Sequence, residues 1–100
     1  MPRKHINSRP DFFQVLGATV QEIKTFIKNE PGNTTWELID VQLDAMLRWS
    51  ANDRTPTKDE RQRVTIGTVA VRELEPAYDP AIYDLTQRLH ELNGYFRDWK

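Results

Sequence analysis

Residues 63–73 read Arg-Val-Thr-Ile-Gly-Thr-Val-Ala-Val-Arg-Glu, and they decide the fold. Taken alone, the stretch is typical of a strand, because β-branched residues dominate it and favour a pleated surface. Its flanks are typical of a helix. Thr57 and Glu60 have the spacing of a capping box, and Pro76 prevents a helix from continuing. Since the span between these signals is long for a strand and ordinary for a helix, the sequence predicts one helix over residues 57–75.

The predicted helix 57–75 is apolar around most of its circumference. Ile66, Val69 and Ala70 widen its main apolar stripe until little polar surface remains. A helix of this kind is buried on several sides. Gly67 in its middle costs roughly 1 kcal/mol relative to alanine, so it indicates close approach of a neighbouring element. We therefore expect this helix to be the buried centre of the fold.

Three further helices are predicted from start and stop signals. The first begins at Ser8 and stops before Pro31. The second opens with a capping box at residues 34–37 and ends between residues 50 and 53. The last starts at Asp79, which is followed by proline. Each carries an apolar stripe at helical spacing, and these stripes are Phe12, Leu16, Val20, Ile23 and Ile27; Trp36, Ile39, Leu43, Met46 and Leu47; and Ile82, Leu85, Leu89, Leu92 and Phe96.

The connections between the predicted helices are short, so successive helices should lie antiparallel. The fold class is therefore all-α, a compact four-helix bundle with the third helix buried at its centre. Residues 8–100 are long enough for one domain with a single core. Residues 1–7 contain little that can be buried, and we expect them to form a flexible tail.

The composition excludes several classes of function. With a net charge of −1, the chain as a whole has no electrostatic attraction for nucleic acid or for an anionic membrane. No apolar run approaches the roughly 20 residues that span a bilayer, and no apolar segment follows the basic first residues as in a secretory signal. The absence of cysteine excludes disulfides and thiolate metal sites. These observations predict a protein of the cytoplasm.

The sequence contains no recognisable catalytic set. The only histidines are His5, in the expected tail, and His90, on the flank of the last helix. The four glycines are well separated, so no phosphate-binding loop is present, and no histidine and carboxylate cluster has the spacing of a metal site. We therefore predict no catalytic residue, no metal and no cofactor.

Acidic residues are the one chemically suggestive group. Glu37, Asp40 and Asp44 fall in one row on the second helix, beside its apolar stripe. A second acidic group runs from the end of the predicted third helix into the last helix and consists of Glu73, Glu75, Asp79 and Asp84. Acids on a helix most often form a solvated face, but segregated acid combined with aromatic residues is also typical of a protein-binding surface. The pattern leaves open whether Trp49, Tyr83, Tyr95 and Trp99 are exposed.

The stretch 63–73, followed by an Asp-Pro helix start, resembles the small bacterial immunity proteins that neutralise the NAD(P)-hydrolysing effector of the type VI secretion system. Further matches are Pro31-Gly32 and Gln42-Leu43. The resemblance implies an inhibitor that binds a cognate toxin in the producer's cytoplasm and blocks the toxin's active site, without chemistry of its own. The candidate contact residues are Glu37, Asp40, Asp44, Glu73, Glu75, Asp79 and Tyr83.

Two other functions remain open at this stage. The chain could be a helical adaptor or a homodimerising module, with an acidic and aromatic face buried against a partner other than a toxin. It could also be a small enzyme that uses the row of carboxylates on the second helix. The sequence does not identify the toxin, because immunity proteins distinguish their partners through differences in affinity.

Overall fold

Four helical segments form the fold, as predicted, but the third is divided into pieces. The computed structural model describes residues 5–74 and 79–99, and no strand occurs among them. The helices are α1 (Arg9–Asn29), α2 (Thr34–Ser50), α3 (Lys58–Arg63), α4 (Ile66–Val69) and α5 (Pro80–Arg97). A 3-10 turn, η1 (Ala51–Asp53), follows α2, and a π-helical turn, η2 (Ala70–Leu74), continues α4. The predicted all-α bundle is confirmed.

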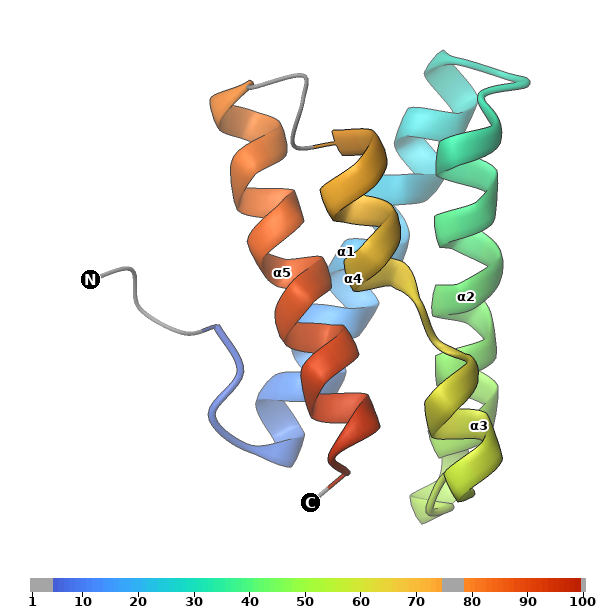
Figure 1. The fold of residues 1–100 in the computed structure, drawn as a ribbon, viewed down its shortest axis with the longest axis vertical. Coiled ribbons are helices and arrows are strands. Elements are labelled where there is room, and N and C mark those ends of the chain that lie inside the picture. The colour runs from blue at the N-terminus through green and yellow to red at the C-terminus, as the bar shows by residue number, and fades with distance from the viewer. Residues whose placement is uncertain (1–4, 75–78, 100) are drawn as a thin grey trace.

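The bundle is about two helices thick. Its extents are 34 × 34 × 20 Å, and a helix with its side chains is roughly 10 Å wide. Helix α1 packs against both α2 and α5, while α4 and η2 pack mainly against α5. Figure 1 shows α4 in front of α1, between α2 and α5, with α3 beside the C-terminal end of α2. The third segment is therefore an outer element laid over the other three helices.

The predicted apolar stripes form the core. Nearly all of their members are buried, and Ile27, Leu47 and Ile82 are partly buried and packed against the rest. At one end of the core, the ring of Phe12 stacks on Tyr95 and Phe96, with centroid distances of 5.0 and 6.3 Å. Trp99 closes this group edge-on to Phe12 at 5.4 Å. The periodicity of the sequence thus located the interior correctly.

The helix starts follow the predicted caps with one exception. Ser8 accepts a hydrogen bond from the Asp11 amide, and the Thr57–Glu60 capping box is complete in both directions. The predicted cap of α2 at residue 34 is wrong. Asn33 caps this helix instead, because its Oδ1 accepts from the amides of Thr35 and Trp36 at 3.0 and 3.3 Å. Asparagine is among the strongest capping residues and ranks above threonine.

The corrected cap can be tested with two neighbouring substitutions. Asn33→Ala should lower the free energy of unfolding by about 1 kcal/mol, because two amides at the start of α2 lose their acceptor. Thr34→Ala should change it by less than about 0.5 kcal/mol, since Thr34 is exposed and lies inside the helix. Urea denaturation followed by circular dichroism measures both. If Thr34→Ala lost more stability than Asn33→Ala, the helix would be capped at residue 34, as the sequence predicted.

The prediction of one continuous helix over residues 57–75 is wrong. Val64 is extended, with ψ 121°, and Thr65 has φ −127°, so the chain leaves helical geometry between α3 and α4. β-branched side chains lose rotamer freedom in a helix, and a run of them lowers the cost of a break. The local strand preference of this stretch therefore prevails for two residues, while its flanks remain helical.

The prediction that the third segment is buried on several sides is also wrong. Ile66, Ala70 and Leu74 face the core, but Val71 is 46% exposed and Thr68 is exposed. This follows from the position of α4 and η2 on the outside of the bundle. The valine, isoleucine and alanine residues of this stretch made it look apolar all round, although only one of its faces is covered.

The close approach predicted at Gly67 is confirmed. The Gly67 amide donates to Asn93 Oδ1 at 2.8 Å. A Cβ at this position would lie 3.3 Å from both Asn93 Oδ1 and His90 Nδ1. Glycine therefore lets α4 lie against α5 with a backbone-to-side-chain hydrogen bond between them.

Part of the expected tail contacts the bundle. Ile6 is only 7% exposed and belongs to the core cluster, and residues 5–7 are described with it. Residues 1–4, Glu75 and the predicted connection 76–78 lie outside the described residues. Within the described part of the chain, no helix is both long enough and apolar enough to cross a membrane.

Candidate functional site

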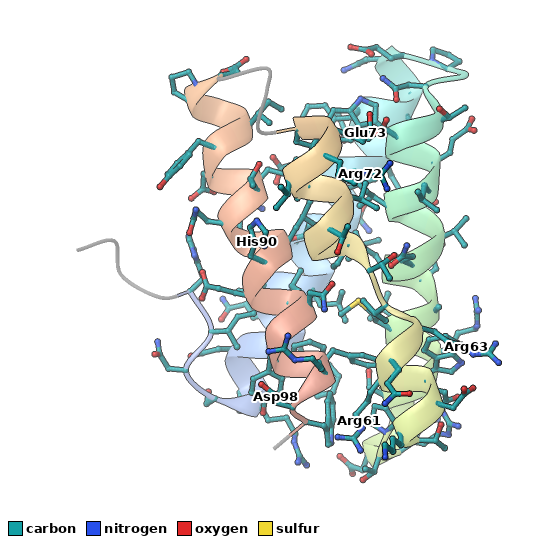
Figure 2. The ribbon with its side chains drawn as sticks, in the orientation of Figure 1. Arg61, Arg63, Arg72, Glu73, His90 and Asp98 are labelled. Carbon is teal, nitrogen blue, oxygen red and sulfur yellow. The ribbon has the colours of Figure 1, made fainter. Side chains whose placement is uncertain are left out.

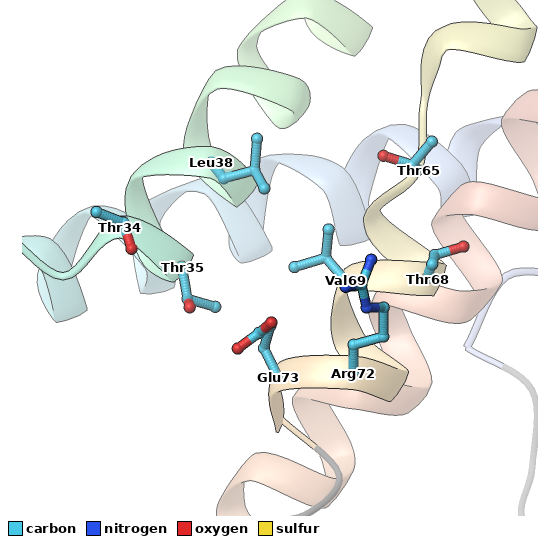
Figure 3. Close-up of a pocket in the computed structure, with 8 residues that line it drawn as sticks. All are labelled: Thr34, Thr35, Leu38, Thr65, Thr68, Val69, Arg72 and Glu73. Carbon is cyan, nitrogen blue, oxygen red and sulfur yellow. The ribbon is translucent and has the colours of Figure 1, made fainter.

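A groove lies between α2 and the outer third segment. Its volume is about 600 Å³. Figure 3 shows that one wall comes from the start of α2 and the other from α4 and η2. We call it the α2–η2 groove, and its lining residues are Thr34, Thr35, Leu38, Thr65, Thr68, Val69, Arg72 and Glu73. The lining combines hydroxyl groups and two opposite charges with an apolar strip formed by Leu38 and Val69.

One end of the groove is fixed by Gln42. Its Nε2 donates to Thr65 Oγ1 at 3.0 Å, and its Oε1 accepts from the Thr65 amide at 2.7 Å. The Thr65 amide, which donates to Gln42, lies at the break between α3 and α4. No side chain of the segment itself caps the start of α4. Gln42 thus compensates for the break and holds the outer segment against α2.

The charged residues of the groove have no internal partner. Among residues 5–74 and 79–99, no hydrogen bond or ion pair involves the side chains of Arg72 or Glu73, and both residues are exposed. Figure 3 shows the Glu73 carboxylate directed across the groove toward Thr35. Glu37, on the outer face of α2, is likewise exposed and unpaired within the described structure. These groups remain available to an external partner.

The predicted row of acids on α2 is divided by the tertiary structure. Lys24, on α1, donates to Asp40 Oδ1 at 3.1 Å and lies 3.6 Å from Asp44 Oδ2. The hydrogen bond with Asp40 raises the pKa of Lys24 above its ordinary value of 10.5, so the ammonium stays charged. Asp40 and Asp44 therefore share one internal cation, whereas Glu37 has no partner among the described residues.

Described acids of the second group lie at the same end of the bundle as Glu37. Figure 1 shows that the start of α2, the end of η2 and the start of α5 all lie at the same end of the bundle. This end carries Glu37, Glu73 and, just before α5, the exposed Asp79. Tyr83, in the first turns of α5, is 58% exposed. Figure 2 places Glu73 far from Asp98, which lies at the opposite end. The fold thus assembles one acidic end from two separate segments of sequence.

Sequence reasoning missed the apolar part of this surface. Leu38 is 47% exposed and Val41 is 63% exposed, both on the outer face of α2. A signal for them existed, because both fall outside the apolar stripe that runs from Trp36 to Leu47. Exposed apolar side chains beside unpaired charges are typical of a binding surface.

Of the aromatic residues whose exposure the sequence left open, only Tyr83 is exposed. Trp49 and Trp99 are partly buried against the core, and Tyr95 is stacked on Phe12. Arg9 covers the ring of Trp99, with its guanidinium carbon 5.2 Å from the ring centroid. These three residues therefore serve packing, and Tyr83 is the aromatic residue that a partner can reach.

Neither histidine lines the α2–η2 groove. His90 lies half-buried beside Gly67 on α5 (Figure 2), and His5 lies between carboxylates of the same helix. Within residues 5–74 and 79–99, no three His, Cys, Asp or Glu side chains are placed to hold a metal ion. What the surface can offer is hydrogen bonding, charge and apolar contact to a macromolecular partner.

Comparison with known proteins identifies the family. No curated protein and no solved structure matches the chain. The model of the Tsi6 family matches residues 11–98, which include all five helices except the first residues of α1. The match contains the α3–α4 break, the Gly67 contact and the acidic end. The chain therefore belongs to the Tsi6 family of type VI secretion immunity proteins.

Proposed function

We propose that this protein binds a cognate effector toxin in the cytoplasm of the producing cell and inhibits it by covering its active site. The family match over residues 11–98 is the observation that carries this proposal. The toxin, by this proposal, consumes NAD(P)+, as the effector of this family does. The protein acts as a stoichiometric inhibitor and performs no chemistry itself.

The acidic end of the bundle is the face that we assign to the toxin. NAD(P)+ carries anionic phosphates, which a cationic cleft attracts, and a surface with unpaired carboxylates is attracted to the same kind of cleft. Glu37 and Glu73 supply those carboxylates. Leu38 and Val41 lie beside them and supply apolar area for close contact. Asp79 and Tyr83 extend the same end.

The remaining candidates contribute less in this arrangement. Asp40 and Asp44 already share Lys24, so binding a toxin cation would have to compete with an existing ion pair. Glu75 lies outside the described residues and stays a candidate from the sequence. We therefore expect Glu37 and Glu73 to contribute most to toxin binding, and Asp40 and Asp44 to contribute least.

Co-expression tests the proposed function directly. The chain is expressed together with the toxin domain encoded beside it, and cell survival and cellular NAD are measured. Survival with NAD preserved supports both the immunity role and the class of toxin. Survival against a toxin that leaves NAD untouched supports the role and rejects the NAD(P)+ assignment. Cell death together with failure to co-purify rejects the immunity proposal for this toxin.

Self-association is the second candidate, because Leu38 and Val41 are exposed beside one another on α2. Two copies could bury these residues in a symmetric contact. Light scattering after size-exclusion chromatography gives the molar mass of the purified chain. A mass of 11.8 kDa at micromolar concentration means a monomer and removes this alternative.

A further inference from the structure

Glu91 on α5 holds the N-terminal segment through both of its carboxylate oxygens. The amides of His5 and Ile6 both donate to Glu91 Oε1, at 2.7 and 3.0 Å. The His5 ring adds a third contact, since its Nδ1 lies 2.6 Å from Glu91 Oε2. Figure 1 shows the segment running beside α5. We call residues 5–7 the N-terminal strap.

The imidazole of His5 lies between two carboxylates. While Nδ1 faces Glu91, Nε2 lies 3.2 Å from Asp84 Oδ1. A neutral imidazole has one N–H donor, whereas a protonated one has two. Only the protonated ring can therefore donate to both acids at once. When the proton is lost, one ring nitrogen presents a lone pair to a carboxylate.

The charged groups around His5 form a connected set. Asp84 also accepts from Arg88 Nε at 2.8 Å, and Arg88 Nη1 lies 2.6 Å from Glu22 on α1. Arg88 is positive and opposes protonation of His5, but it is already engaged by two acids. The balance raises the pKa of His5 above its ordinary value of 6.5, chiefly through the hydrogen bond with Glu91, and the desolvation of the ring works in the opposite direction.

The strap also covers part of the core. Ile6 is 7% exposed and packs with the buried cluster of the bundle. The side chain that covers the core therefore directly follows the side chain that titrates. A change in the ring contacts of His5 is transmitted to Ile6 through one peptide unit.

We propose that the N-terminal strap is a protonation-dependent latch, in which the imidazolium of His5 clamps the segment between Glu91 and Asp84 and loss of its proton loosens Ile6 from the core. The folded state binds the proton of His5 more tightly than the unfolded state does, so protonation stabilises the fold. The latch then contributes fully to stability below pH 6.5, the ordinary pKa of histidine. This contribution is lost as the pH rises through the higher pKa that His5 has in the folded chain. The two backbone hydrogen bonds to Glu91 remain, so the strap loosens rather than unfolds.

Nuclear magnetic resonance can follow the latch because the chain has only two histidines. The ring signals of His5 are titrated in the folded chain and in urea, and the heteronuclear NOE of the Ile6 amide is measured between about pH 5 and about pH 9. We expect a higher pKa for His5 in the folded chain, and an NOE that falls as His5 loses its proton. An identical His5 pKa in both states, or an NOE independent of pH, would overturn the proposal.

Three variants separate the latch from general effects of charge. Glu91→Gln should bring the pKa of His5 down toward its value in urea, whereas the matched change Glu37→Gln, on the outer face of α2, should leave it unchanged. His5→Gln removes the titrating ring, and the Ile6 amide should then have a low NOE at every pH. An Ile6 amide that stays rigid in His5→Gln would contradict the proposed role of the imidazolium.

Discussion

Reversing the charge of both Glu37 and Glu73 to arginine should weaken binding of the cognate toxin by about 100-fold or more, and should abolish protection of the cell. Like charges brought together across an interface cost several kcal/mol, and each 1.4 kcal/mol is a tenfold change in affinity. Both carboxylates are exposed and have no partner among the described residues, so the substitutions break no internal ion pair. The dissociation constant is measured by calorimetry, with circular dichroism to verify the fold.

The matched control is Asp98→Arg. This residue is exposed at the opposite end of the bundle, and its ion pair with Arg97 is a surface pair worth at most about 1 kcal/mol (Figure 2). The change in charge per residue is the same, but binding should be nearly unaffected. If Asp98→Arg weakens binding as much, per residue changed, as the double variant does, the loss is caused by the net charge and not by the acidic end. Full binding by the double variant would reject this face while leaving the immunity role intact.

Phe12→Ala is expected to lower the free energy of unfolding by about 3–5 kcal/mol. The ring of Phe12 is fully buried and contacts Tyr95, Phe96 and Trp99, so its removal leaves a cavity among rigid aromatic rings. Domains of this size are stable by only roughly 5–15 kcal/mol, so the variant should lose a large part of its stability. Urea denaturation followed by circular dichroism gives the value.

The adjacent Phe13 provides the control for this prediction. It is the same residue type on the same helix, but it is 36% exposed and lies at the edge of the aromatic group. Phe13→Ala should cost roughly 1 kcal/mol, in the ordinary range for point substitutions. Equal losses for the two variants would mean that the aromatic group is not packed around Phe12 as described.

The sequence predicted most of the fold because its strongest signals are local. The caps at Ser8 and Thr57, and the proline at the start of α5, each act within three or four residues and lie where they were expected. The misplaced cap at α2 was also a local matter, since Asn33 was simply a better acceptor than its neighbour. The apolar stripes were correct because helical period alone determines which side chains share a face.

The candidate site was predicted only in part, because pairing of charges depends on residues far apart in the chain. Glu37, Asp40 and Asp44 do lie on one helix, but Lys24 on another helix pairs with Asp40 and Asp44. Glu37 and Glu73 are separated by a long stretch of sequence and share one end of the bundle only because α4, which η2 continues, packs against α2. The exposed Leu38 and Val41 could have been noticed from their position outside the stripe.

The sequence by itself determined the number of helical segments, their starts and the composition of the core, since capping and periodicity act through neighbouring residues. Only the tertiary structure decided how the third segment breaks, because the amide exposed at Thr65 is satisfied by Gln42 from another helix. It also decided which acids remain free and that Glu91 holds the N-terminal strap. Each of these outcomes depends on contacts between distant parts of the chain, which no local pattern specifies.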